Sequence, residues 1–176
     1  MNLKHLIIIV LASALIGCAG TPKTASGSTE APAHSFGIYL VAFTADKPWG
    51  AATLGDLAAL RLANEPVLSD ADILSYDFTD HRMLVRRGAL SRLPKPPVWG
   101  APFVVVADGQ RVYLGAFGTM LSSSSTSVPT ILVDFAEFTN SLTIGRAYPA
   151  PGFATGPDPR SDDRIRLALA GLKKLK

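Results

Sequence analysis

The apolar run near the start of the chain most constrains the fold, because it indicates that the first residues are a signal segment and do not belong to the folded domain. Lys4 and His5 precede the run, residues 6–16 are almost wholly aliphatic, and Cys18 follows closely. A positive start, a short apolar stretch and small residues at its end are the three parts of a secretory signal. About eleven residues make a helix of roughly 16 Å, too short for a bilayer core of about 30 Å. The sequence therefore predicts a cleavable signal over residues 1–17.

The last residues of this segment, Leu15-Ile16-Gly17-Cys18, resemble the lipobox of bacterial lipoproteins. The resemblance implies that the Cys18 sulfur is lipidated, that the chain is cut just before it, and that the lipid holds the mature protein on a membrane of the cell envelope. Ala19, rather than Asp, follows the cysteine, which implies an outer-membrane location facing the periplasm if the cell is Gram-negative. An ordinary signal peptide with a chance cysteine is the alternative.

Composition excludes several classes of site. Cys18 is the only cysteine, so neither an internal disulfide nor a cysteine zinc site can form. His5 leaves with the signal, and His34 lies in residues 18–35, whose Ser, Thr, Gly, Pro and Ala residues are typical of a flexible tether. His81 alone cannot build a poly-histidine metal site, so we expect no cofactor. The net charge of +3 is too small to indicate nucleic-acid binding.

Residues 36–176 are expected to form a single α+β domain. Asp108-Gly109 between two β-rich runs predicts a hairpin over residues 102–117, and the apolar run 36–43 predicts a central strand buried on both faces. We expect a mostly antiparallel sheet of about five or six strands, with two or three helices on one face. The other predicted strands are 73–78, 83–86, 129–135 and 142–147, and the predicted helices are 49–62, 88–93 and 161–172.

Three short stretches in residues 66–134 carry a second resemblance. They are Leu68-Ser69-Asp70-Ala71-Asp72-Ile73, Val104-Val105-Val106-Ala107-Asp108-Gly109 and Pro129-Thr130-Ile131. Their order is similar to that in the periplasmic first domain of the SecD protein-export subunit. The resemblance implies an α+β fold and nothing about export, because the sequence shows no counterpart of SecD's membrane helices.

Candidate catalytic residues do not form a recognisable motif. A Ser/His/Asp hydrolase could be assembled from Ser122–Ser125, His81 and one of Asp77, Asp80 or Asp108. However, the chain has no Gly-x-Ser-x-Gly elbow to present a serine. We therefore assign no catalytic residue.

A calcium site is the other chemistry that the acidic residues suggest. Asp70, Asp72, Asp77 and Asp80 lie close together in the sequence, but the order of ligands in an EF-hand loop is missing. Asp72 fits better three residues after Ser69, where the two can cap a short turn. We therefore assign no metal ligand.

A polar run near the end of the chain favours a structural role. The run extends from Asp158 to Arg164, and Asp158 or Ser161 can cap the last predicted helix. We expect Arg160 and Arg164 to pair with Asp163 or with the turn that precedes it.

One cluster of basic residues is a candidate partner surface, which could meet an anionic phospholipid or glycan acid; an ordinary solvated face is the alternative. Its members are Arg82, Arg86, Arg87, Arg92 and Lys95. Together with the predicted lipid anchor, this cluster favours a non-enzymatic binding or assembly module of the cell envelope. An envelope hydrolase or glycan-acting enzyme without a recognisable motif is the alternative function.

Overall fold

A computed structural model describes residues 34–42, 56–134 and 136–176. The predicted signal, Cys18, most of the tether and the first part of the predicted helix 49–62 lie outside the described residues. Residues 31–176 form one compact unit. None of the helices in the described ranges is long and apolar enough to cross a bilayer.

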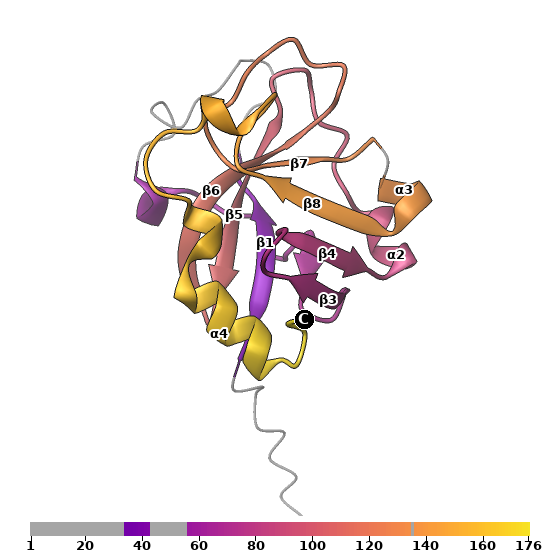
Figure 1. Cartoon of the computed structure of the whole chain (residues 1–176), viewed down its shortest axis with the longest axis vertical. Coiled ribbons are helices and arrows are strands. Elements are labelled where there is room, and N and C mark those ends of the chain that lie inside the picture. The colour runs from indigo at the N-terminus through magenta and orange to yellow at the C-terminus, as the bar shows by residue number, and fades with distance from the viewer. Residues whose placement is uncertain (1–33, 43–55, 135) are drawn as a thin grey trace, which may run out of the picture. The chain divides into compact units, whose positions relative to one another are not determined.

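An eight-stranded sheet organises this unit, with strand order β2-β1-β5-β6-β7-β8-β4-β3 (Figure 1). Neighbouring strands pair antiparallel except for β6 and β7, which are parallel. The α+β class and the mostly antiparallel sheet are as predicted, but the sheet has eight strands rather than five or six. The strands are β1 (Phe36–Leu40), β2 (Leu68–Ser69), β3 (Ile73–Asp77), β4 (Arg82–Val85), β5 (Ala101–Ala107), β6 (Gln110–Gly118), β7 (Thr130–Leu132) and β8 (Ser141–Gly145).

The two edge strands of the sheet, β2 and β3, are joined by a single short turn. The sheet therefore curls until its edges approach each other, and it becomes nearly barrel-like (Figure 1). The carboxylate of Asp72 holds the turn, since it accepts hydrogen bonds from both Ser69 N and Ser69 Oγ at 2.8 Å. These bonds confirm the predicted capped turn.

The predicted hairpin forms from β5 and β6. Asp108 and Gly109 both have positive φ angles, 48° and 74°, as the two central residues of a type I′ turn require. Farther along β6, a Cβ on Gly115 would collide with the ring of Phe103 and the carbonyl of Pro129. A glycine is therefore needed there because the backbone lies against its neighbours.

The main core lies inside the curled sheet and beneath helix α4 (Asp163–Gly171), which packs against β1 and β5 (Figure 1). Ile165, Ala168 and Leu169 are the buried residues of α4, as the apolar spacing predicts. The cap of α4 is Asp162, whose carboxylate accepts from Arg164 N, so neither Asp158 nor Ser161 caps it. Asp158 instead caps the 3₁₀ turn η3 (Pro159–Ser161).

A smaller core lies on the opposite face of β5 and β1. Val104 and Val105 are both fully buried, so β5 is buried on both faces. In the predicted strand 36–43, Ile38 belongs to the main core and Val41 to the smaller one, and β1 lies between β2 and β5, so its interior position is as predicted. Leu60 packs with Val104 in this smaller core. The predicted helix 49–62 is wrong over its described part, which contains only the 3₁₀ turn η1 (Leu57–Ala59) before an extended segment that pairs Leu62 with Val41.

The helices do not share one face of the sheet. Helix α4 covers β1 and β5, whereas the short helices α2 (Arg87–Leu90) and α3 (Ala136–Thr139) contact each other beside the end of β8 (Figure 1). A further 3₁₀ turn, η2 (Pro151–Phe153), lies in the loop before η3. Consequently, no described helix lies across the outer face of β7, β8, β4 and β3, and this face carries the candidate site, which Ala136 of α3 helps to line.

Candidate functional site

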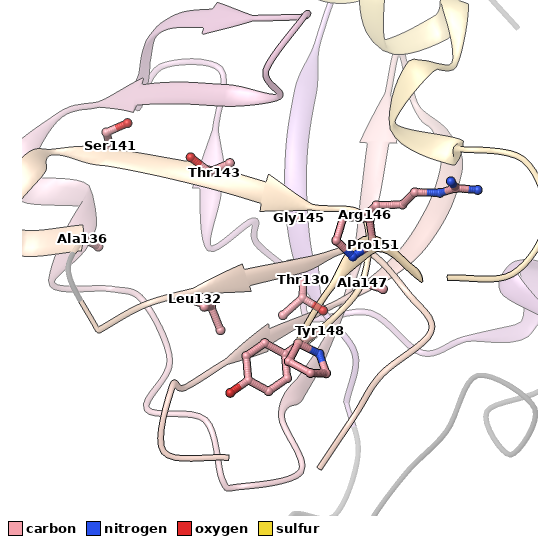
Figure 2. A pocket seen from close by; sticks show the side chains of 11 residues that line it. Thr130, Leu132, Ala136, Ser141, Thr143, Gly145, Arg146, Ala147, Tyr148 and Pro151 are labelled. Carbon is pink, nitrogen blue, oxygen red and sulfur yellow. The ribbon is translucent and has the colours of Figure 1, made fainter. Parts of the chain in front are cut away.

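The candidate site is a hollow on the outer face of β7 and β8 (Figure 2). Leu142 and Ile144 of β8 enter the core, so the alternate residues of that strand face outward. The floor is made by small side chains of β8 with two residues of β7, and the volume is about 350 Å³. These floor residues are Thr130, Leu132, Ser141, Thr143 and Gly145.

Tyr148 forms the wall at one end, together with Pro149 and Pro151. Its backbone is paired with that of Thr126, through N–H to O distances of 3.2 and 2.9 Å. Its phenol donates to the carbonyl of Ser122 at 3.2 Å. Because the backbone of Tyr148 and its phenol hydroxyl both make hydrogen bonds, its aromatic ring is held in one orientation and is not free to rotate.

The hollow is lined by neutral hydroxyl groups, some of them unused, and by one charged side chain. Thr130 Oγ1 already donates to Val128 O at 3.0 Å, whereas the hydroxyls of Ser141 and Thr143 make no hydrogen bond to another described residue. Arg146 is the one charged residue that the described lining contains. It donates Nη2 to the carbonyl of Gly156 at 2.7 Å, and Figure 2 shows its guanidinium directed away from the other lining side chains.

A second hollow of about 320 Å³ adjoins the first on β3, β4 and β8. Ser141 lines both, so the two hollows adjoin on the same face of the sheet. The second contains charged residues of both signs, Asp77 with Arg82 and Lys176. The two hollows therefore differ in charge, because the floor of the first is neutral and the lining of the second is mixed.

Two members of the predicted basic surface have partners within the fold. Arg86 donates Nε to the carbonyl of Ala71 at 2.9 Å, and Arg92 pairs with Asp72 at 2.6 Å. Both therefore stabilise the turn between the edge strands. Burial opposes ionisation of Asp72, but hydrogen bonds from Arg92 and Ser69 outweigh it and lower the pKa of that carboxyl. Arg82, Arg87 and Lys95 have no such partner among the described residues.

The candidate hydrolase residues are not brought together. His81 is only 5% exposed, and its Nδ1 lies 3.2 Å from the hydroxyl of Tyr76. Ser122 donates Oγ to the carbonyl of Val98. Ser122 lies after the end of β6, whereas Asp108 lies in the turn before its start, so the length of the strand separates the two side chains. Asp77 is occupied by the turn amides of Thr79 and Asp80, so no Ser/His/Asp arrangement forms from this set.

The candidate calcium ligands Asp72 and Asp77 accept hydrogen bonds in two different turns. Asp72 closes the turn after β2, while Asp77 closes the turn between β3 and β4. In the described part of the chain, no three His, Cys, Asp or Glu side chains are grouped so that they could hold a metal ion.

A half-buried polar cluster of Arg160 and Asp158 lies close enough to buried His81 to affect its charge. The sequence indicated the polar run that contains Arg160 and Asp158, but nothing in it placed His81 nearby. Nε and Nη2 of Arg160 donate to the two carboxylate oxygens of Asp158 at 2.9 and 2.5 Å, and Nη1 donates to the carbonyl of Ile144 at 2.5 Å. These hydrogen bonds lower the pKa of Asp158 to about 2. Burial, with the nearby positive charge of Arg160, lowers the pKa of His81.

The arginine pairs differ from those predicted. Arg160 pairs with Asp158 and Arg164 with Asp162, each two residues away, while Asp163 is taken by Arg166. The Arg160 pair is the most enclosed of the three, and it attaches η3 to β8. The cluster is therefore structural, and the hollows on the outer face remain the candidate binding site.

Comparisons with protein-family models, with curated proteins and with solved structures find no match to this chain.

Proposed function

We propose that this protein is a lipid-anchored binding or assembly module of the bacterial cell envelope. One observation carries the proposal: the only cysteine, Cys18, directly follows Leu15-Ile16-Gly17 at the end of an apolar run too short to span a bilayer. In a Gram-negative cell, the lipid on Cys18 would hold the protein in the outer membrane, facing the periplasm.

The place where the chain enters the folded unit supports this function. His34 and Ser35 are bonded to the Asp108 carboxylate at 3.0 and 2.8 Å, at the turn between β5 and β6. The hollow beside Tyr148 adjoins β7, which pairs with the opposite end of β6 at Ala116–Gly118. Strands of this length extend about 20–25 Å at 3.3 Å per residue. A chain anchored before His34 would therefore present the hollow at the end remote from its anchor.

The uncovered outer face supports binding rather than catalysis. Its two hollows adjoin at Ser141. His81 and Ser122 make hydrogen bonds elsewhere, and the carboxylate of Asp77, which lines the second hollow, accepts from the amides of its own turn. Arg82 lies in the second hollow, and Arg87 and Lys95 remain available to an anionic surface such as phospholipid or a glycan acid. We propose no nucleic-acid partner, because the net charge is only +3.

Replacing Cys18 with Ser tests the anchor. We expect the Cys18→Ser protein to leave the membrane fraction and to lose labelling by a palmitate analogue, because serine has no thiol to accept the lipid. Ala19→Ser is the matched control, since it changes the adjacent residue and keeps the thiol. A Cys18→Ser protein that still sediments with membranes would contradict the proposal.

A further inference from the structure

We infer that the hollow beside Tyr148 binds a neutral saccharide through one sugar ring. The inference rests on the proposed binding function and names the chemical class of its ligand. The volume of about 350 Å³ is at the lower end of the range for small-molecule pockets, about 300–1,000 Å³. A ligand portion of one or two rings therefore suits this hollow.

The aromatic wall matches the apolar face of a sugar. A pyranose ring exposes C–H groups on its faces and hydroxyls around its edge. The C–H groups carry slight positive charge and pack favourably on the electron-rich face of an aromatic ring. Tyr148 is held in place by its phenol bond to Ser122 and its backbone pairing with Thr126, so little conformational entropy is lost when a ligand stacks on it.

The two unused hydroxyls match the edge of such a ring. Ser141 and Thr143 are alternate residues of β8, so their side chains stand about 6–7 Å apart on one face. Each hydroxyl can both donate and accept a hydrogen bond, as sugar hydroxyls also do. A ligand whose polar groups have this dual character is satisfied whichever way each bond is directed.

The charge of the hollow favours a neutral ligand. No carboxylate is among the described lining residues, and the guanidinium of Arg146 donates to the carbonyl of Gly156 and is directed away from the other lining side chains (Figure 2). A cationic ligand group on the floor would lose its hydration without gaining an opposite charge, and an anionic group placed there would not meet the guanidinium. The structure therefore favours an uncharged sugar unit over an acidic one at this position.

Peptide ligands fit the same surface less well. A proline-rich peptide docks in grooves lined by several aromatic residues, and Tyr148 is the one aromatic residue in the described lining. An extended peptide that adds a strand needs an unpaired sheet edge. Both strands of the floor are interior to the sheet, since β7 lies between β6 and β8, and β8 between β7 and β4.

The test uses the full-length protein solubilised in detergent, titrated by calorimetry with three probes. Two are neutral oligosaccharides, tri-N-acetylchitotriose and maltotriose, and the third is a decaproline peptide. We expect saturable binding of at least one oligosaccharide with a Kd at or below about 1 mM, and none of decaproline. Tyr148→Ala should weaken that binding about tenfold through loss of the stacking ring.

Matched variants separate the binding effect from misfolding. Tyr148→Phe keeps the ring and should bind within about threefold of wild type, while Thr143→Val should weaken binding several-fold through loss of one hydroxyl. Phe138→Ala removes an aromatic residue that is 82% exposed and does not line the hollow, so it should bind as wild type does. Circular dichroism checks the fold of each variant.

Three results would overturn the inference: a folded wild-type protein that binds neither oligosaccharide, a decaproline complex that depends on Tyr148, or sugar binding undiminished by both Tyr148→Ala and Thr143→Val. Each of these results can be told apart from a failure of the lipid-anchor proposal. The Cys18→Ser fractionation measures only membrane attachment, whereas the titration measures only ligand binding in the hollow.

Discussion

At the scale of single residues, the turn between β5 and β6 shows how one backbone conformation selects a residue type. Asp108 and Gly109 both adopt positive φ, a region that aspartate tolerates and glycine enters without steric cost. A Cβ placed on Gly109 would meet no atom within 4 Å. Glycine is therefore required at position 109 because of the backbone conformation, and not because a side chain there would collide with its neighbours.

This distinction predicts the effect of Gly109→Val. A β-branched residue is strained at positive φ, so we expect the free energy of unfolding to fall by about 1–2 kcal/mol. Gly152→Val is the control, because a Cβ at Gly152 also meets no atom and its φ is not in the positive region. Chemical denaturation measures both. Equal midpoints for Gly109→Val and wild type would show that the turn is placed wrongly.

At the scale of elements, the segment after α4 protects an edge of the sheet. Lys174 accepts a hydrogen bond from Tyr76 N at 2.7 Å, and Lys176 N donates to Tyr76 O at 2.9 Å, so Leu175 forms a parallel bridge with β3. Unpaired strand edges recruit other strands and lead to aggregation. A three-residue segment at this position therefore acts as a cover for β3.

Removing residues 174–176 should expose that edge. We expect the truncated protein to self-associate, because the N–H and C=O of Tyr76 lose their partners, and we expect faster hydrogen exchange at the Tyr76 amide. Sedimentation velocity and amide exchange measure the two effects. Lys174→Ala is the control, because it removes a side chain and keeps the backbone bonds. A truncated protein that stays monomeric with a protected Tyr76 amide would contradict this role.

At the scale of the whole molecule, the nearly closed sheet brings together a partly buried polar cluster from parts distant in the sequence. His81 lies in the turn between β3 and β4, while Arg160 and Asp158 belong to the loop before α4. The charged groups around His81 are Arg160, Asp158, Asp77 and Asp80, and the first lowers its pKa while the carboxylates raise it. Burial remains the largest cause, so the neutral imidazole is favoured in the folded protein.

The cluster predicts that stability falls on acidification in two windows. The pKa of His81 is lower in the folded than in the unfolded state, so the unfolded chain gains the proton first as the pH falls below about 6.5. Asp158 has a pKa of about 2 against an ordinary 3.8. Its contribution, about 1–2 kcal/mol after allowance for solvent screening, is present above pH 4 and is lost between pH 4 and pH 2.

Thermal unfolding measured between pH 7 and pH 2 checks both windows. The variant Asp158→Asn should remove most of the loss between pH 4 and pH 2 that this carboxylate causes, while the loss below pH 6.5 should persist because His81 is unchanged. A midpoint that rises on acidification, or an unchanged acid profile in Asp158→Asn, would contradict this account.

Much of the fold could be predicted because its signals are local. The β5–β6 hairpin, the capped turn at Ser69 and the buried face of α4 depend on turn chemistry and on apolar spacing within a few residues. The export signal and the lipobox cysteine are also properties of the sequence, and they stay predictions because they lie outside the described residues. The helix predicted over residues 49–62 is wrong in its described part, because Leu60 is used in the core beside β5.

The candidate site was not predictable, because it depends on which segments the curled sheet brings together. In the sequence, Tyr148 belongs to a proline-rich loop and Thr143 to a short strand, and neither pattern indicates a binding site. The two residues line one hollow only because β8 pairs beside β7 and no described helix lies across their outer face. The Arg160 cluster likewise exists only because the fold brings the loop before α4 close to His81 in the turn between β3 and β4. By itself, the sequence determines the local turns, since these need only neighbouring residues, and it predicts the signal and the lipidated cysteine on the same local grounds. The hollows, the protected edge of β3 and the half-buried Arg160–Asp158 pair beside His81 were decided by the tertiary structure, since long-range packing alone sets which surfaces are covered.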